Sequence, residues 1–304
     1  MVVKTNKDCL MRQVVMGKVS APTLAVSGRG SYVTTWDGKP KLGIGIGGIK
    51  LNVKVGDPCL GWPQTEYMEP GVALMGVDDS ASAGRNAPGS AQAFVKYSCI
   101  GNIAEVVSGA AKGAKGYITG KGGMGGTSRH IQTHFDQETK EKLLIGDKIK
   151  VNSNGVAFKV EGFDGNVYNM DPSFFEAMNP ELDGETLELP VAKVIPIIAM
   201  GYGVGGSSAE SGTWCIQSNP PHLVEKLGLS DLKFGDIVAL QDGLISYGKG
   251  YYKGAITVGV VTTGESHVAG QGPGVMAIAS SKHGKIKTRV DPSANVAKYL
   301  GVGA

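Results

Sequence analysis

Glycine constrains the fold of this chain more than any other residue: 47 of the 304 residues are glycine. They stand in short clusters between short runs of valine and isoleucine, and their share is about twice the usual 7%. Glycine permits positive φ angles and close backbone approach, whereas β-branched residues favour strands. Runs such as 43–49, 191–199 and 255–261 therefore predict short strands joined by tight turns.

We accordingly expect a β-rich α+β fold, with glycine-rich sheets in a barrel-like or sandwich arrangement and a few short helices. Apolar spacing and Pro or Gly at the ends predict helices over 99–111, 137–144, 219–228 and 291–301. The acidic, turn-rich stretch 171–188 is the best candidate boundary. It would separate an N-terminal region, 1–170, which carries a loop of glycines and histidines, from a C-terminal region, 171–304. One continuous domain is the alternative.

A Gly-Asp pair flanked by apolar residues occurs three times, about ninety residues apart, at Gly56-Asp57, Gly146-Asp147 and Gly235-Asp236. Each predicts a turn that leads into a strand with alternating apolar residues. Independent use of one common turn is the simpler interpretation, and a structural repeat is the alternative.

Composition and charge restrict the partners. A net charge of +3, without a basic stripe, argues against nucleic acid. Four cysteines lie far apart and form no CxxC pair, which argues against a cysteine-based zinc site and favours a reducing, cytoplasmic setting. Because there is no signal peptide and no apolar run long enough to cross a bilayer, we expect no membrane partner.

The stretch 121–136 concentrates the residues that could carry chemistry. We expect a ligand to contact its basic and glycine residues, namely Lys121, Gly122, Gly123 and Arg129. His130 could be catalytic, because histidine can move a proton near neutral pH. His130 and His134 stand four apart and would share one metal if they lay on a helix, whereas a strand or loop would separate their rings. We expect at most one divalent metal per chain; the cofactor is otherwise unknown.

Further candidates follow other predicted strands. His267 lies in a glycine-rich loop with Gly270 and Gly272, after the run 255–261, which makes it a second catalytic candidate. Asp78 and Asp79 follow the apolar run 72–77 and could orient a proton-transferring histidine or hold a metal; an Asp-rich turn is the alternative. Glu66 and Glu69 are weaker candidates of the same kind. The pattern Gly-x-Ser-x-Gly fails around Ser266, which disfavours a serine hydrolase.

Several segments in order resemble the domain of unknown function 4438 family of prokaryotes. They are 120–123 with His130 downstream, 141–151, 234–238 with 254–260, and 269–275. This resemblance covers most of the chain and implies a fold and an intracellular setting, but no reaction.

Together these observations predict a cytoplasmic small-molecule enzyme, hydrolase-like, that acts on a carboxylate- or amide-bearing substrate and forms a homo-oligomer. The glycine loops at 43–48, 120–126, 201–206 and 270–274 would bind the anionic part of the substrate. If 120–126 and 270–274 face one cleft, His130 and His267 should line it. The alternative is a non-catalytic ligand-binding or assembly subunit, in which the glycines only close turns.

Overall fold

The computed structural model describes residues 3–24, 32–63, 65–79, 89–122, 130–203, 209–210, 212–246 and 249–302. Within them the fold is built mainly from strands, with a few short helices, which confirms the predicted fold class. The helices and 3-10 turns are η1 (Lys7–Cys9), α1 (Gly89–Tyr97), α2 (Gln137–Lys142), α3 (Pro172–Ala177), η3 (Ile197–Ala199), α4 (Pro221–Leu227), η4 (Leu229–Asp231) and α5 (Val296–Leu300). None of the helices in these ranges has the length and apolar character that crossing a membrane requires.

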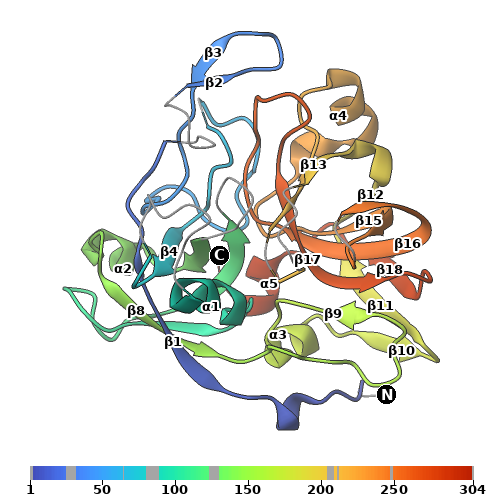
Figure 1. The fold of residues 1–304 in the computed structure, drawn as a ribbon, viewed down its shortest axis with the longest axis horizontal. Helices are drawn as coiled ribbons and strands as arrows, with labels where there is room; N and C mark the ends of the chain where they lie inside the picture. The colour runs from blue at the N-terminus through green and yellow to red at the C-terminus, as the bar shows by residue number, and fades with distance from the viewer. Residues whose placement is uncertain are drawn as a thin grey trace.

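Six antiparallel strands close a barrel in the order β1-β4-β7-β6-β5-β8, and β8 pairs back with β1 (Figure 1). They are β1 (Gln13–Val19), β4 (Val72–Gly76), β5 (Ile103–Val106), β6 (Lys115–Gly122), β7 (His130–His134) and β8 (Lys148–Ser153). Alternate residues point inward, so that Leu74, Ile131 and Ile149 form the barrel core. Phe94 of α1 packs into the same core.

A seven-stranded sheet lies beside the barrel and uses mainly later parts of the chain (Figure 1). Its strands are β12 (Lys193–Pro196), β15 (Ile237–Leu244), β16 (Gly250–Val261), β17 (Gly274–Ser281), β14 (Trp214–Ile216), β13 (Met200–Gly203) and, paired with β17, β9 (Asn166–Val167). Smaller sheets are β10 (Glu181–Asp183), β11 (Thr186–Val191) and β18 (Ile286–Val290), and the hairpin β2 (Tyr32–Thr34) with β3 (Pro40–Leu42). Because β9 precedes residue 170 yet joins the later sheet, the two predicted regions share hydrogen bonds; their division at 170 stays a prediction.

One predicted helix is wrong. Residues 99–111 do not form a helix but contain β5, whose burial alternates from exposed Ile103 to buried Ala104. Gly101, at φ +94°, turns the chain just before the strand. The apolar residues that suggested one helical face serve two different cores: Ile100 packs in the core beside the seven-stranded sheet, and Ala104 in the barrel.

Candidate functional site

A buried polar network of three residues lies where the barrel meets the segment that precedes β4. Ser20 follows β1, His130 begins β7, and Glu69 lies in the segment 65–70. The Ser20 hydroxyl is 3.2 Å from His130 Nε2, and His130 Nδ1 is 2.9 Å from Glu69 Oε2. All three residues are buried, Glu69 completely. A hydroxyl, an imidazole and a carboxylate thus stand in one hydrogen-bonded row.

Two glycines, Gly47 and Gly48, allow the backbone to approach Ser20 and Glu69 closely. Gly47 and Gly48 have φ angles of +71° and +73°, which favour glycine. The Gly47 N–H donates to Glu69 Oε2 at 2.7 Å. A Cβ at residue 47 would clash with the Ala21 carbonyl and would lie 3.2 Å from the Ser20 hydroxyl. The predicted glycine loop 43–48 therefore does lie against a polar cluster.

The charges favour an ionised Glu69. Burial alone would raise the pKa of Glu69, but His130, Lys50 and the Gly47 N–H together outweigh burial and lower that pKa. Lys50 is the neighbouring cation: its ammonium donates to the Gly47 carbonyl, and burial lowers its pKa to about 8. A carboxylate that is ionised fixes the histidine proton on Nδ1, so that the lone pair of Nε2 faces Ser20.

Polar atoms without a partner stand at the edge of the network. Within the described ranges neither Glu69 Oε1 nor Gln132 Nε2 has a hydrogen-bond partner, although both are buried. Both face Gly122: a Cβ there would clash with Gln132 Nε2 and would lie 2.6 Å from Glu69 Oε1. The predicted ligand residue Gly122 therefore makes room for the side chains of the network.

A nucleophile next to a base, with the base oriented by a third group, is the arrangement that activates serine in hydrolases. Here His130 Nε2 can take the proton of the Ser20 hydroxyl, and Glu69 can stabilise the imidazolium that forms. The predicted role of His130 as a proton carrier fits this geometry. The site lies on the outer face of the barrel wall, because Ile131 and Thr133 alternate with His130 and Ile131 packs in the barrel core.

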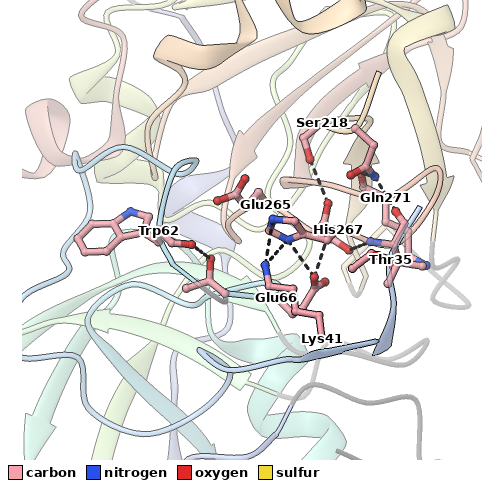
Figure 2. Close-up of polar contacts among 12 residues, drawn as sticks. Thr35, Lys41, Trp62, Glu66, Ser218, Glu265, His267 and Gln271 are labelled. Atoms are coloured by element: carbon pink, nitrogen blue, oxygen red, sulfur yellow. Dashed lines mark hydrogen bonds and ion pairs between the residues drawn. The ribbon is translucent and has the colours of Figure 1, made fainter. Parts of the chain in front are cut away.

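The second predicted histidine makes a similar contact with the same segment (Figure 2). His267 Nδ1 lies 3.1 Å from Glu66 Oε1, and the His267 backbone N–H donates to the same oxygen at 2.8 Å. Lys41 of β3 places its ammonium 2.6 Å from His267 Nδ1 and 2.9 Å from His267 Nε2. Burial lowers the pKa of Lys41, although Glu66 and Glu265 oppose the shift. The His267 side chain is one-third exposed, so this cluster is more open than the first.

Glu66 and Glu69 thus orient one histidine each. The later glycine loop also approaches the first cluster: a Cβ at Gly122 would lie 3.1 Å from Thr263, whose hydroxyl accepts from the Gly274 N–H at 3.0 Å. These contacts connect the described ends of the two loops. That the rings of His130 and His267 line one cleft stays a prediction.

His130 and His134 lie on a strand, the alternative that separates their rings, and this geometry argues against a shared metal. Both residues lie on β7, where four residues span about 13 Å, too far for one ion. Within the described ranges no cluster of three or more His, Cys, Asp or Glu residues could hold a metal ion. His134 faces a different pocket, beside α2.

Lys121 stays a predicted ligand-binding residue, but its ammonium is engaged inside the protein, which argues against that role. It is fully buried and lies 2.7 Å from Asn169 Oδ1, 3.1 Å from the Glu210 carbonyl and 3.4 Å from the Lys96 carbonyl. Burial lowers the pKa of Lys121 to about 8. Two further predicted ligand residues, Gly123 and Arg129, lie outside the described residues.

The remaining predicted residues lie in turns and sheet contacts. Asp78 is exposed and accepts a hydrogen bond from the Ser90 hydroxyl of α1 at 2.8 Å. Asp79 is buried, and its backbone carbonyl accepts from the Lys18 ammonium at 2.9 Å. Gly270 accepts from the Tyr202 N–H, and a Cβ at Gly272 would clash with the Ile216 carbonyl. A catalytic role of the aspartates and a ligand role of these glycines stay predictions.

Sequence reasoning missed Ser20, Lys41 and Gln132, and gave Glu69 too little weight. Ser20 follows a strand without any flanking motif, and triads are recognised by geometry rather than sequence position. The one available signal was the pair of glutamates at 66 and 69 beside the glycine loop 43–48. Nothing in the sequence shows that this segment folds back over β7.

Comparison with known proteins gives a family but no activity. Residues 32–176 match the family model described as domain of unknown function (DUF4438), N-terminal, and residues 178–300 match its C-terminal counterpart. A solved structure described as the crystal structure of TM1086 is 38% identical, with a TM-score of 0.86, and the alignment covers 98% of this chain and 99% of that one. A search of curated proteins finds no match.

Proposed function

The chain belongs to the DUF4438 family, whose description carries no reaction, and we propose from the site geometry that it is a hydrolase of small acyl compounds. The observation that carries this proposal is the row of Ser20, His130 and Glu69, with contacts of 3.2 and 2.9 Å. The sequence argues against a serine hydrolase only through the missing elbow motif around Ser266. Ser20 lies outside any such motif.

In the proposed reaction the Ser20 oxygen attacks the carbonyl carbon of an ester or amide. The hydroxyl proton moves to His130 Nε2, and Glu69 stabilises the resulting imidazolium. The same proton then passes to the departing alcohol or amine, which leaves an acyl group on Ser20. Water, deprotonated by His130, hydrolyses this acyl group and restores the serine.

Burial argues for a small substrate. The Ser20 residue is 2% exposed and Glu69 is 0% exposed, so the site does not present its hydroxyl to a polymer on the surface. An amide or ester of a small carboxylic acid fits this enclosure better, in line with the carboxylate- or amide-bearing substrate expected from the sequence. Removal from water also strengthens the electrostatic contacts of the row.

The same burial favours a second candidate, a non-catalytic ligand-binding or assembly subunit. In that case the row only ties the segment 65–70 to the barrel, and Glu69 is retained because an unpaired buried carboxylate would be costly. The two candidates differ in the reactivity of Ser20.

A small fluorophosphonate probe tests this difference, because an activated serine displaces fluoride and gains a phosphonyl group. We expect labelling at Ser20, located by mass spectrometry, none in Ser20→Ala, and a decrease of roughly 10²-fold or more in His130→Gln. Ser153→Ala is the matched control, since this buried serine on β8 donates to the Tyr97 carbonyl at the end of α1 and its loss should leave labelling unchanged.

The proposal fails if the folded wild-type protein is neither labelled nor active on small ester and amide substrates. If, in addition, His130→Gln and Ser20→Ala lower the melting temperature, the row is structural. Measuring stability beside labelling therefore separates the two candidates.

The cytoplasmic setting is part of the same proposal and is supported by the cysteines. All four are unpaired, and Cys59, Cys99 and Cys215 are buried. Free buried thiols suit a reducing compartment. A small molecule remains the proposed partner, rather than nucleic acid or membrane, and homo-oligomer formation is a proposal that light scattering of the purified protein can check.

A further inference from the structure

A pocket beside α2 carries basic side chains that the proposed reaction does not use (the helix is labelled in Figure 1). Its volume is about 400 Å³, within the range of small-molecule sites. The basic groups in its wall are Lys54, His134 and Lys140, and the side-chain amides are those of Asn52 and Gln137. Leu51 and Phe135 add an apolar wall. Cations and amides around one cavity are the groups that bind oxyanions.

Lys140 is held in place by the protein. Its ammonium donates to the carbonyls of Lys50 and Leu51 at 3.2 and 2.9 Å, which uses two of its three hydrogens. Because the side chain is fixed before a ligand arrives, less conformational entropy is lost when an anion takes the third hydrogen.

Two carboxylates, Asp57 and Asp136, also line the pocket, but each is engaged by the backbone. Asp57 Oδ2 accepts from the Lys54 N–H, and Asp136 Oδ1 accepts from the Thr139 N–H, both at 2.7 Å. Burial is the largest cause of the lowered pKa of His134. Lys140 and Lys54 lower this pKa further, and Asp136 raises it by a smaller amount. The lysines therefore outweigh Asp136 at His134, whereas at Lys140 burial lowers the pKa and Asp57 opposes that shift.

We propose that this pocket binds a small organic anion through a phosphate or carboxylate group, contacted by Lys54, His134 and Lys140. The site is separate from the Ser20 row, because His134 lies about 13 Å along β7 from His130. It does not depend on the hydrolase proposal, and an anion bound there would be attracted by the ammonium groups of Lys54 and Lys140.

Titration with inorganic phosphate, at constant ionic strength set with chloride, tests the proposal. We expect a saturable shift of the His134 imidazole resonance in NMR, assigned with His134→Gln, and an upward shift of its pKa because an anion favours the charged ring. Lys54→Gln should weaken binding about tenfold or more. A parallel titration with acetate distinguishes the ligand groups: tighter phosphate binding assigns a phosphate ester, and comparable binding assigns a carboxylate.

Lys142→Gln is the matched control, since it removes a cation from the same helix that pairs with Glu138 at the surface. It should bind phosphate as the wild type does. Equal weakening in Lys54→Gln and Lys142→Gln would show only general charge attraction and would overturn the proposal. So would the absence of saturation up to tens of millimolar phosphate in the folded protein.

Discussion

At the scale of single residues, Gly47 is the position on which the Ser20 row most depends. Its φ of +71° and the Ala21 carbonyl next to its Cα leave no room for a side chain. We predict that Gly47→Ala lowers the free energy of unfolding by about 2 kcal/mol or more, because backbone strain and a steric clash add. It should also lower Ser20 labelling, since the Gly47 N–H holds Glu69.

Gly38→Ala gives the matched comparison for thermal and chemical unfolding. Gly38 also has a positive φ, +81°, but nothing lies within 4 Å of a Cβ built there. Gly38→Ala should therefore lower the free energy of unfolding only by the conformational cost of a positive φ, about 1 kcal/mol. Equal losses at the two positions would mean that close approach at Gly47 contributes nothing.

Residue chemistry could be predicted only in part. The glycine-rich surroundings of His130 indicate this residue, but its partners lie just after β1 and in the segment before β4, which are more than 60 residues away in the chain. Such contacts depend on strand pairing, which no local pattern encodes. The spacing of His130 and His134 fits one metal only on a helix, and the local sequence does not distinguish a helix from a strand there.

At the scale of elements, the three Gly-Asp pairs form the same turn. Gly56, Gly146 and Gly235 all have φ near +90°. In each case the aspartate side chain accepts from the N–H three residues earlier, at 2.7, 2.9 and 2.8 Å. The second and third turns lead into β8 and β15. The sequence predicted these turns because the glycine angle and the aspartate bond are both local.

We predict that Asp147→Ala lowers the free energy of unfolding by about 1–3 kcal/mol, because the Leu144 N–H loses its carboxylate partner at the start of β8. The Ser108 hydroxyl, 3.2 Å from the other oxygen, loses a partner too. Urea unfolding provides the measurement. Asp183→Ala, at an exposed position of β10, is the control and should change stability by less than about 0.5 kcal/mol. An Asp147 variant as stable as this control would contradict the turn's role.

The helix predicted over 99–111 is wrong because this one segment contributes residues to two different hydrophobic cores. Ile100 and Ala104 are four apart, as on a helix face, yet they contact different clusters on either side of the Gly101 turn. Apolar spacing alone cannot separate these cases. In contrast, the helix after Asp136 was predicted correctly, since its cap, an aspartate that accepts from the Thr139 N–H, is a local signal.

At the scale of the whole molecule, the buried Lys121 joins the barrel to the rest of the fold. The sequence predicted a β-rich protein, but it could not show that β6 would end against Asn169 and Glu210. Among the residues that the structure describes, Lys121 makes that connection through three oxygen acceptors, none of them a carboxylate. A lysine in a glycine-rich loop looks like a ligand contact in sequence, whereas its burial depends on the packing of distant strands.

This burial predicts a rise in stability with pH. The pKa of Lys121 is about 8 in the folded protein, against an ordinary 10.5. Below pH 8 both folded and unfolded states hold the proton, and the cost of burying the charge is present in full. Between pH 8 and 10.5 the unfolded state binds more protons, so the free energy of unfolding increases with pH. From pH 8 to 9.5 the Lys121 contribution should increase by on the order of 2 kcal/mol.

Other groups also titrate in this range, so the prediction concerns a difference between proteins. The stability of the wild type, measured by urea unfolding, should increase relative to Lys121→Met as the pH rises from 8 to 9.5. Lys142→Met serves as the control, because Lys142 is exposed and its partner Glu138 raises its pKa, which leaves it charged in both states over this interval. Parallel pH dependence of the wild type and Lys121→Met would show that Lys121 keeps its proton when buried. Its three oxygen acceptors would then stabilise a charged ammonium inside the protein.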